Sequence, residues 1–146
     1  DIDKPYKVGY IAGVFDLFHI GHLNMFKRAK EQCRYLIVGV VSDEGVRLNK
    51  QAEPFVPFDE RIEMVRSCKY VDEAIKLPLD FCGTRDMFKI YHFDVQFSGS
   101  DYEHDPAWLA EKEFLEKNGS TMVFFPYTQS TSSTKLKRAI ENRINN

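Results

Sequence analysis

Apolar residues occur along this chain in two alternating patterns, short continuous runs and longer stretches with helical spacing. The clearest continuous run, residues 35–41 (Y-L-I-V-G-V-V), has the length and β-branched content of a buried strand. Residues 21–32 instead carry apolar side chains at three- and four-residue spacing, which predicts an amphipathic helix. Applied to the whole chain, these patterns predict strands over 7–12, 35–41, 72–77, 94–98 and 121–125, and helices over 21–32, 58–68, 85–92, 106–117 and 132–144.

This alternation of strands and helices predicts an α/β fold. We expect a single Rossmann-like domain over residues 1–146, with a parallel five-stranded sheet and helices on both faces. Right-handed crossovers place the ligand crevice of such a sheet at the carboxyl ends of its strands. The loops after Ala12, Ser98 and Phe125 therefore become the candidate site.

Composition narrows the functional classes. The 146 residues are 43% hydrophobic and 29% charged, which suits one globular core. A net charge of −2 shows no basic surplus, so we expect no nucleic acid partner. No apolar run reaches membrane-spanning length and no leader resembles a signal peptide, so we expect no membrane association and a cytoplasmic protein. Cys33, Cys68 and Cys82 have no C-x-x-C spacing, which favours reduced thiols over disulfides or zinc.

The strongest chemical signal is the loop at 13–22, G-V-F-D-L-F-H-I-G-H. Gly13 is expected to let the backbone turn sharply beside a ligand, and Gly21 to let an anion approach the helix that follows. His19 and His22 lie three residues apart at this helix start, so they would share one face. Two imidazole donors there suit the negative charge that develops on a phosphorus under attack.

Two other interpretations of the histidines stay open at this point. A zinc site is one, although His92 and His104 offer no ligand-like spacing. A pair of buried structural histidines is the other. Neither the P-loop pattern nor the G-x-G-x-x-G dinucleotide pattern is present.

The pattern G-x-F-D-x-x-H-x-G-H resembles the signature of the cytidylyltransferase group in the HIGH-type nucleotidyltransferase superfamily. This group includes glycerol-3-phosphate, phosphoethanolamine and phosphocholine cytidylyltransferases. The similarity continues through R-Y-L-I-V-G-V at 34–40, S-D-E at 42–44, D-E-R at 59–61, K-Y-V-D-E at 69–73, G-S-D at 99–101 and Y-T-Q-S-T-S-S-T at 127–134.

The resemblance implies transfer of CMP from CTP to a phosphorylated small molecule, with Mg²⁺ as cofactor, in a homodimer whose interface lies near 69–73. It implies catalytic roles for His19, His22 and Lys50, and no protein ligand for the metal. It implies nucleotide contacts from Gly13, Val14, Phe15, Gly21, Arg61, Gly99, Asp101, Thr128, Ser132 and Ser133.

The residues themselves leave simpler alternatives for some of these roles. Lys50, placed in the linker between the second strand and the second helix, could be a solvated lysine, and Arg61 could be a surface charge. Asp101 could hold the substrate, help orient magnesium or cap a turn, and Ser132 could cap the last helix.

Four positions depart from the family pattern. Val14 stands for Thr, Lys69 for Arg, Tyr127 for Arg and Ser130 for Gly. These changes remove a hydroxyl and a fixed positive charge near the expected triphosphate. Val14 and Tyr127 motivate one rival function, a nucleotide-binding domain without catalysis. Two other rivals are an adenylyltransferase of the same superfamily using ATP, and one domain of a larger enzyme.

Overall fold

Five parallel strands form one sheet in the order β3-β2-β1-β4-β5. The computed structural model describes residues 3–50, 52–77, 83–126 and 133–145, without the side chains of 49, 50 and 133. Each strand lies within two residues of its predicted position. The strands are β1 (Tyr6–Gly13), β2 (Cys33–Val41), β3 (Glu73–Leu77), β4 (Val95–Gly99) and β5 (Met122–Phe125).

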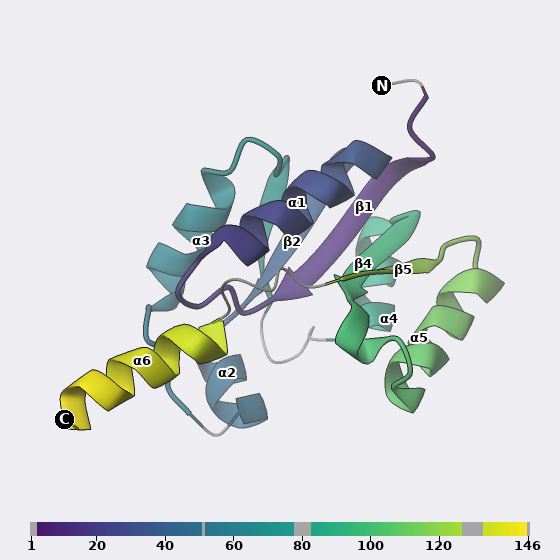
Figure 1. Ribbon diagram of the computed structural model, residues 1–146. Helices are drawn as coiled ribbons and strands as arrows, with labels where there is room; N and C mark the ends of the chain where they lie inside the picture. Colours follow the sequence, from purple (N-terminus) through teal and green to yellow (C-terminus); the bar gives the residue numbers. More distant parts are fainter. Residues whose placement is uncertain (1–2, 51, 78–82, 127–132, 146) are drawn as a thin grey trace.

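Helices cover both faces of the sheet, as the sequence predicted (Figure 1). On one face, α1 (Ile20–Gln32) and α3 (Phe58–Arg66) pack against alternate strand residues such as Ile11 and Val38. On the other face, α4 (Thr84–Tyr91) and α5 (Pro106–Lys117) pack against Tyr10, Ile37 and their neighbours. Because side chains alternate along a strand, adjacent residues of β1 enter different cores.

Local signals explain the bounds of α5, which match the prediction. The Asp105 carboxylate accepts a hydrogen bond from the Ala107 N–H at 2.9 Å, and Pro106 occupies the first turn. Gly119, just past the end, has a φ of +86°, a conformation that glycine adopts without strain.

One helix was missed. The sequence predicted a turn at 42–44 and a linker carrying Lys50, but α2 (Asp43–Lys50) is helical and Lys50 is its last residue. The Ser42 hydroxyl accepts a hydrogen bond from the Gly45 N–H at 3.1 Å and so caps the first turn. Val46, only 2% exposed, anchors the helix to the core. Gly45 and the helix's short length concealed this pattern.

The strand order reverses direction at β1, which lies between β2 and β4. The loop from β1 to α1 and the short 3₁₀ helix η2 (Ser100–Tyr102) after β4 therefore leave the sheet at neighbouring carboxyl ends. Helix α6 (Ser133–Asn145) lies beside this end of the sheet (Figure 1). This reversal point is where open α/β sheets bind ligands. None of the helices in the described ranges is long and apolar enough to cross a membrane.

Candidate active site

The loop after β1 makes its sharp turn with two bulky residues rather than with glycine. Phe15 and Leu17 have φ of 58° and 53°, in the left-handed region that side chains disfavour. The Phe15 ring lies directly against Gly13, where an added Cβ would come within 2.8 Å of the ring. Gly13 is therefore not one of the residues with left-handed φ at this turn, and its contact with a nucleotide stays a prediction. This glycine makes room for the Phe15 ring.

His19 and His22 hold the start of α1 through a reciprocal pair of hydrogen bonds. His19 is the N-cap residue, and its Nδ1 accepts from the Gly21 N–H at 3.0 Å. The His19 backbone N–H donates to the His22 Nδ1 at 3.2 Å. This is a capping box built from imidazoles. The two ring centroids lie 4.0 Å apart, so the predicted meeting of the histidines on one face is confirmed.

These hydrogen bonds fix the protonation of both rings. An Nδ1 that accepts carries no hydrogen, so each neutral imidazole has its proton on Nε2. Burial, reinforced by the charge of His19 and opposed by Asp16, lowers the pKa of His22 to about 3. Burial also lowers the pKa of His19 below its ordinary value. Near pH 7 the site therefore presents two neutral Nε2–H donors.

Aromatic rings pack around His22. The centroids of the Phe15 and Phe18 rings each lie 5.3 Å from the His22 centroid, and Phe15 also contacts Phe26 in the core. The Phe15 side chain is 6% exposed. The ring therefore lies against His22, and a contact between Phe15 and a nucleotide stays a prediction.

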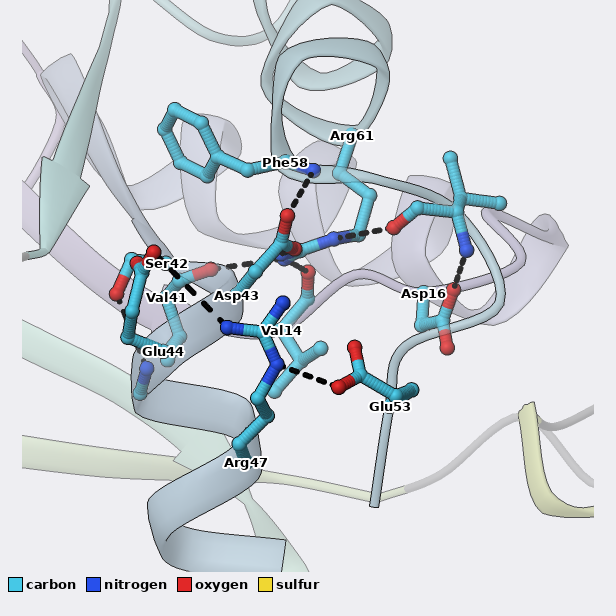
Figure 2. Close-up of polar contacts among 12 residues, drawn as sticks. Val14, Asp16, Val41, Ser42, Asp43, Glu44, Arg47, Glu53, Phe58 and Arg61 are labelled. Carbon is cyan, nitrogen blue, oxygen red and sulfur yellow. Dashed lines mark hydrogen bonds and ion pairs between the residues drawn. The ribbon is translucent and has the colours of Figure 1, made fainter.

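Arg61 is buried beneath this loop rather than lying on the surface. Its side chain is 1% exposed, which overturns the surface-charge alternative. Figure 2 shows the guanidinium reaching from α3 toward the ends of β1 and β2. It donates to the carbonyls of Val14, Val41 and Val56, each at 2.8 Å, and to the Asp43 carboxylate at 2.6 Å. Arg61 thus holds the loop in place, and its direct contact with a nucleotide stays a prediction.

Asp16 is a second buried charge on the same loop, and no role was predicted for it. Its carboxylate, 2% exposed, accepts the backbone N–H groups of Phe55 at 2.8 Å and Val56 at 2.9 Å. The Lys137 ammonium of α6 lies 2.9 Å away. Burial alone would raise the pKa of Asp16, but these partners outweigh it and hold the pKa below its ordinary value. Asp16 belongs to the motif at 13–22, so its position could have indicated a role. No pattern in the sequence around Lys137 indicated that it would reach the site.

Gly99 and Asp101 reach the predicted end of the sheet. Gly99 is the last residue of β4, and Asp101 lies exposed in η2. Because β4 pairs with β1, this segment leaves the sheet beside the histidine loop. A contact between Asp101 and a nucleotide stays a prediction.

The remaining predicted residues are only partly visible. Lys50 ends α2 and Ser133 begins α6, but their side chains are outside the described part of the chain. Thr128 and Ser132 lie outside the described residues altogether.

The described residues contain no group of three or more His, Cys, Asp or Glu placed to hold a metal ion. A zinc ion held by His19 and His22 would thus need ligands from elsewhere. Moreover, the Nδ1 atoms of both rings are already engaged in the cap. The geometry does not favour the zinc interpretation.

A pocket of about 550 Å³ lies on the α3 side of the loop. Its lining combines Phe15, Leu17, Phe18, Val56, Met64 and Leu136 with Glu60, Arg61 and Glu63. Apolar walls and two carboxylates disfavour a triphosphate. The phosphate site expected here is therefore the helix start with its imidazoles, not this pocket.

The comparisons with known proteins agree with this geometry. The family model described as cytidylyltransferase-like matches residues 10–139. The chain is 36% identical over 139 residues to a FAD synthase of Thermococcus kodakarensis, covering 92% of this chain and 89% of that protein. It is 34% identical over 141 residues to an ethanolamine-phosphate cytidylyltransferase of Dictyostelium discoideum, covering 94% of this chain but only 39% of that protein.

A solved structure shows the same fold. The lipopolysaccharide core biosynthesis protein from Thermoplasma volcanium superimposes with a TM-score of 0.67 at 25% identity. The match covers 86% of this chain and 99% of that chain.

Proposed function

This chain belongs to the cytidylyltransferase-like family, and from that premise we propose that it transfers CMP from CTP to a small phosphomonoester. The products are a CDP-linked compound and pyrophosphate. The observation that carries the proposal is the paired Nε2–H donors of His19 and His22 at the start of α1, where the strand order reverses.

The reaction needs no covalent intermediate with the protein. A phosphomonoester has a second pKa of about 6, so its oxygens are already ionised near pH 7. One of these oxygens attacks the α-phosphorus of CTP and forms the new P–O bond, while the bond to the β-phosphate oxygen breaks. Pyrophosphate leaves with the electron pair.

The two histidines stabilise the charge that builds on the α-phosphoryl oxygens. Neutral N–H donors can do this without a proton transfer, because they are set in place before the reaction starts. The free backbone N–H groups and the dipole of α1 favour the same charge. The role of Lys50 and of the hydroxyl groups of Thr128, Ser132 and Ser133 is to hold the triphosphate.

Mg²⁺ fits this scheme as a companion of the nucleotide. Magnesium is commonly bound by substrate phosphates, several waters and one or two carboxylates, so a dedicated protein cage is unnecessary. Asp101, exposed beside the expected triphosphate, would supply one carboxylate at most. When bound, the ion neutralises charge on the leaving pyrophosphate.

Adenylyl transfer from ATP is the second candidate function. The similarity to a FAD synthase supports it, because FAD carries an adenylyl group. The loop, the histidines and α1 would serve either nucleotide, since they face phosphates rather than the base. The identity of the base therefore has to be measured.

A pyrophosphate-release assay tests the proposal. CTP and ATP are each supplied with magnesium and with glycerol phosphate, phosphoethanolamine, phosphocholine or flavin mononucleotide as acceptor. We expect release that depends on CTP and on one of the first three acceptors. Release that depends on ATP would establish the second candidate instead. Thermal stabilisation by CTP without release in any combination would indicate a binding domain without catalysis.

We also retain the homodimer and the cytoplasmic location expected from the sequence as proposals. Light scattering at several protein concentrations gives the oligomeric state, and a monomer would remove residues 69–73 from the proposed interface.

A further inference from the structure

We propose that the Asp16–Lys137 ion pair is a positioning device that couples α6 to the histidine loop. The inference rests on the proposed function, because it assigns these two residues to the geometry of that reaction. Neither residue would touch the reacting phosphates. Both would act through the backbone that carries His19 and His22.

The first step in the argument is the strain in the loop. Asp16 lies between Phe15 and Leu17, the two residues with left-handed φ. Each such residue costs about 1–3 kcal/mol and persists only where surrounding contacts fix it. The Asp16 carboxylate, 2% exposed, supplies those contacts at the centre of the strained turn.

The second step is where the partners of Asp16 come from. Its carboxylate accepts two backbone N–H groups from the segment before α3, at Phe55 and Val56. The Val56 carbonyl accepts from Arg61, so Val56 is held at both its N–H and its C=O. The histidine loop and the segment before α3 therefore form one hydrogen-bonded unit.

Lys137 adds α6 to this unit. Its ammonium lies 2.9 Å from an Asp16 oxygen and 5.5 Å from the centroid of the Phe55 ring. Elsewhere on α6, the part-buried side chains of the described helix are Leu136 and Ile140. The rest of the described helix surface is exposed. The ion pair is thus a principal attachment of α6, and it joins the helix at the strained turn.

This attachment has a consequence for catalysis. In the sequence, the hydroxyl-rich residues 128–134 lead directly into α6. Fixing α6 at Asp16 would therefore set Ser133, the first residue of this helix and a predicted triphosphate contact, relative to the histidine donors. Small errors in such alignment are costly, since a displacement of about 1 Å can lower a rate by about a hundredfold.

The test compares Lys137→Met with Lys137→Arg and with Arg138→Met. Methionine keeps an unbranched side chain but removes the charge that lies over the Phe55 ring, and arginine restores a charge. Arg138, the next residue on α6, is exposed and provides a control for loss of a positive charge. All assays are run at a temperature where each variant is fully folded.

We expect Lys137→Met to lower kcat about tenfold while the KM for the nucleotide changes less than about twofold. Lys137→Arg should recover most of the loss, and Arg138→Met should behave as the native protein. In a cycle with Asp16→Asn, the two losses should be far from additive, because both substitutions break the same pair. A kcat for Lys137→Met within twofold of native, or an equal loss in Arg138→Met, would overturn the inference.

A second readout separates this inference from the proposed function. Amide hydrogen exchange at Phe55 and Val56, and the ring NMR signals of His22, report on the loop without any turnover. We expect faster exchange and shifted His22 signals in Lys137→Met, but not in Arg138→Met. If the native protein releases no pyrophosphate, the proposed function fails, while unchanged exchange and unchanged ring signals would refute the coupling itself.

Discussion

The two faces of the sheet are held by different kinds of interaction. On the α4 and α5 face, apolar and aromatic side chains form the contacts, with the rings of Tyr10 and Phe93 stacked at 4.9 Å. On the α1 and α3 face, a similar apolar core ends at the histidine loop. There the buried charged side chains of Asp16 and Arg61 make the contacts that hold the backbone. Apolar packing positions whole elements, whereas directed hydrogen bonds position one loop at the accuracy that catalysis needs.

The energetic reason lies in the backbone of that loop. Two left-handed side-chain-bearing residues cost a few kcal/mol, and apolar burial has no directionality with which to hold them. Hydrogen bonds to charged groups contribute about 1.5–3 kcal/mol each. The bonds made by Arg61 and Asp16 can therefore sustain the strained conformation.

The largest effect on activity is expected at the two histidines. His19→Asn keeps an N-cap acceptor and His22→Gln keeps an acceptor at the third helical position, so the capping box survives while both Nε2–H donors are lost. We expect each substitution to lower kcat by about 10²–10³-fold, the range for removing one charge-stabilising donor. Pyrophosphate release gives kcat, and circular dichroism checks the fold. A folded double variant with native turnover would contradict the assignment.

A matched pair of substitutions separates the two faces. Arg61→Met removes a buried guanidinium and leaves the carbonyls of Val14, Val41 and Val56 without this donor, at a cost of about 1–3 kcal/mol for each group left unsatisfied. Phe93→Ala truncates a ring that is 1% exposed, with a similar cost of about 3–5 kcal/mol. We expect only Arg61→Met to lower the kcat of the folded protein.

Denaturant unfolding measures both stability losses, and kcat is measured on protein that is fully folded. Equal kcat losses in the two variants would show that the loop depends on general stability rather than on the bonds of Arg61.

The stability of the protein should depend on pH in a way that reports on the histidine loop. His22 has a pKa of about 3 in the folded protein and an ordinary value of 6.5 when unfolded. Between these values the unfolded chain binds more protons, so stability should fall as the pH drops below about 6.5. The pKa values of Asp16 and Asp43 lie below 3.8, so their contributions are lost only at lower pH.

Thermal unfolding from pH 7 to pH 5 isolates the histidine contribution. His22→Gln should weaken this dependence, and the part that remains comes from His19, whose pKa burial also lowers. If the stability of His22→Gln depends on pH as steeply as that of the native protein, then burial does not keep the His22 ring neutral in the native protein.

The smallest effect is expected at Val14, where the family carries Thr. The Val14 carbonyl already accepts from Arg61, so Val14→Thr should leave the loop in place and add one hydroxyl near the expected triphosphate. One added hydrogen bond contributes about 1 kcal/mol, which predicts a KM for the nucleotide a fewfold lower. Val14→Ala is the control. If Val14→Thr and Val14→Ala have the same KM for the nucleotide, the side chain at position 14 does not contact the nucleotide.

Part of this site could be predicted from sequence because its signals are local. The glycines and histidines of 13–22 lie within ten residues, and a helix start brings His19 and His22 together whatever the rest of the fold does. The sequence placed Arg61 near the site but did not predict that its side chain is buried. A charged residue on an amphipathic helix resembles a surface residue. Its partners Val14 and Val41 lie in the loop after β1 and at the end of β2, and no pattern in one segment marks such contacts.

By itself, the sequence determined the alternation of strands and helices, the parallel sheet and the paired imidazoles, since each depends on periodicity or on neighbours along the chain. Only the tertiary structure decided that Phe15 and Leu17 make the turn, that Gly13 accommodates a ring, and that α6 reaches Asp16. The physical reason is that a buried charge pairs with the groups that the fold brings next to it, and these need not be its neighbours along the chain. The carboxylate of Asp16 and the ammonium of Lys137 lie near opposite ends of the chain, and only the tertiary fold brings them within 2.9 Å of each other.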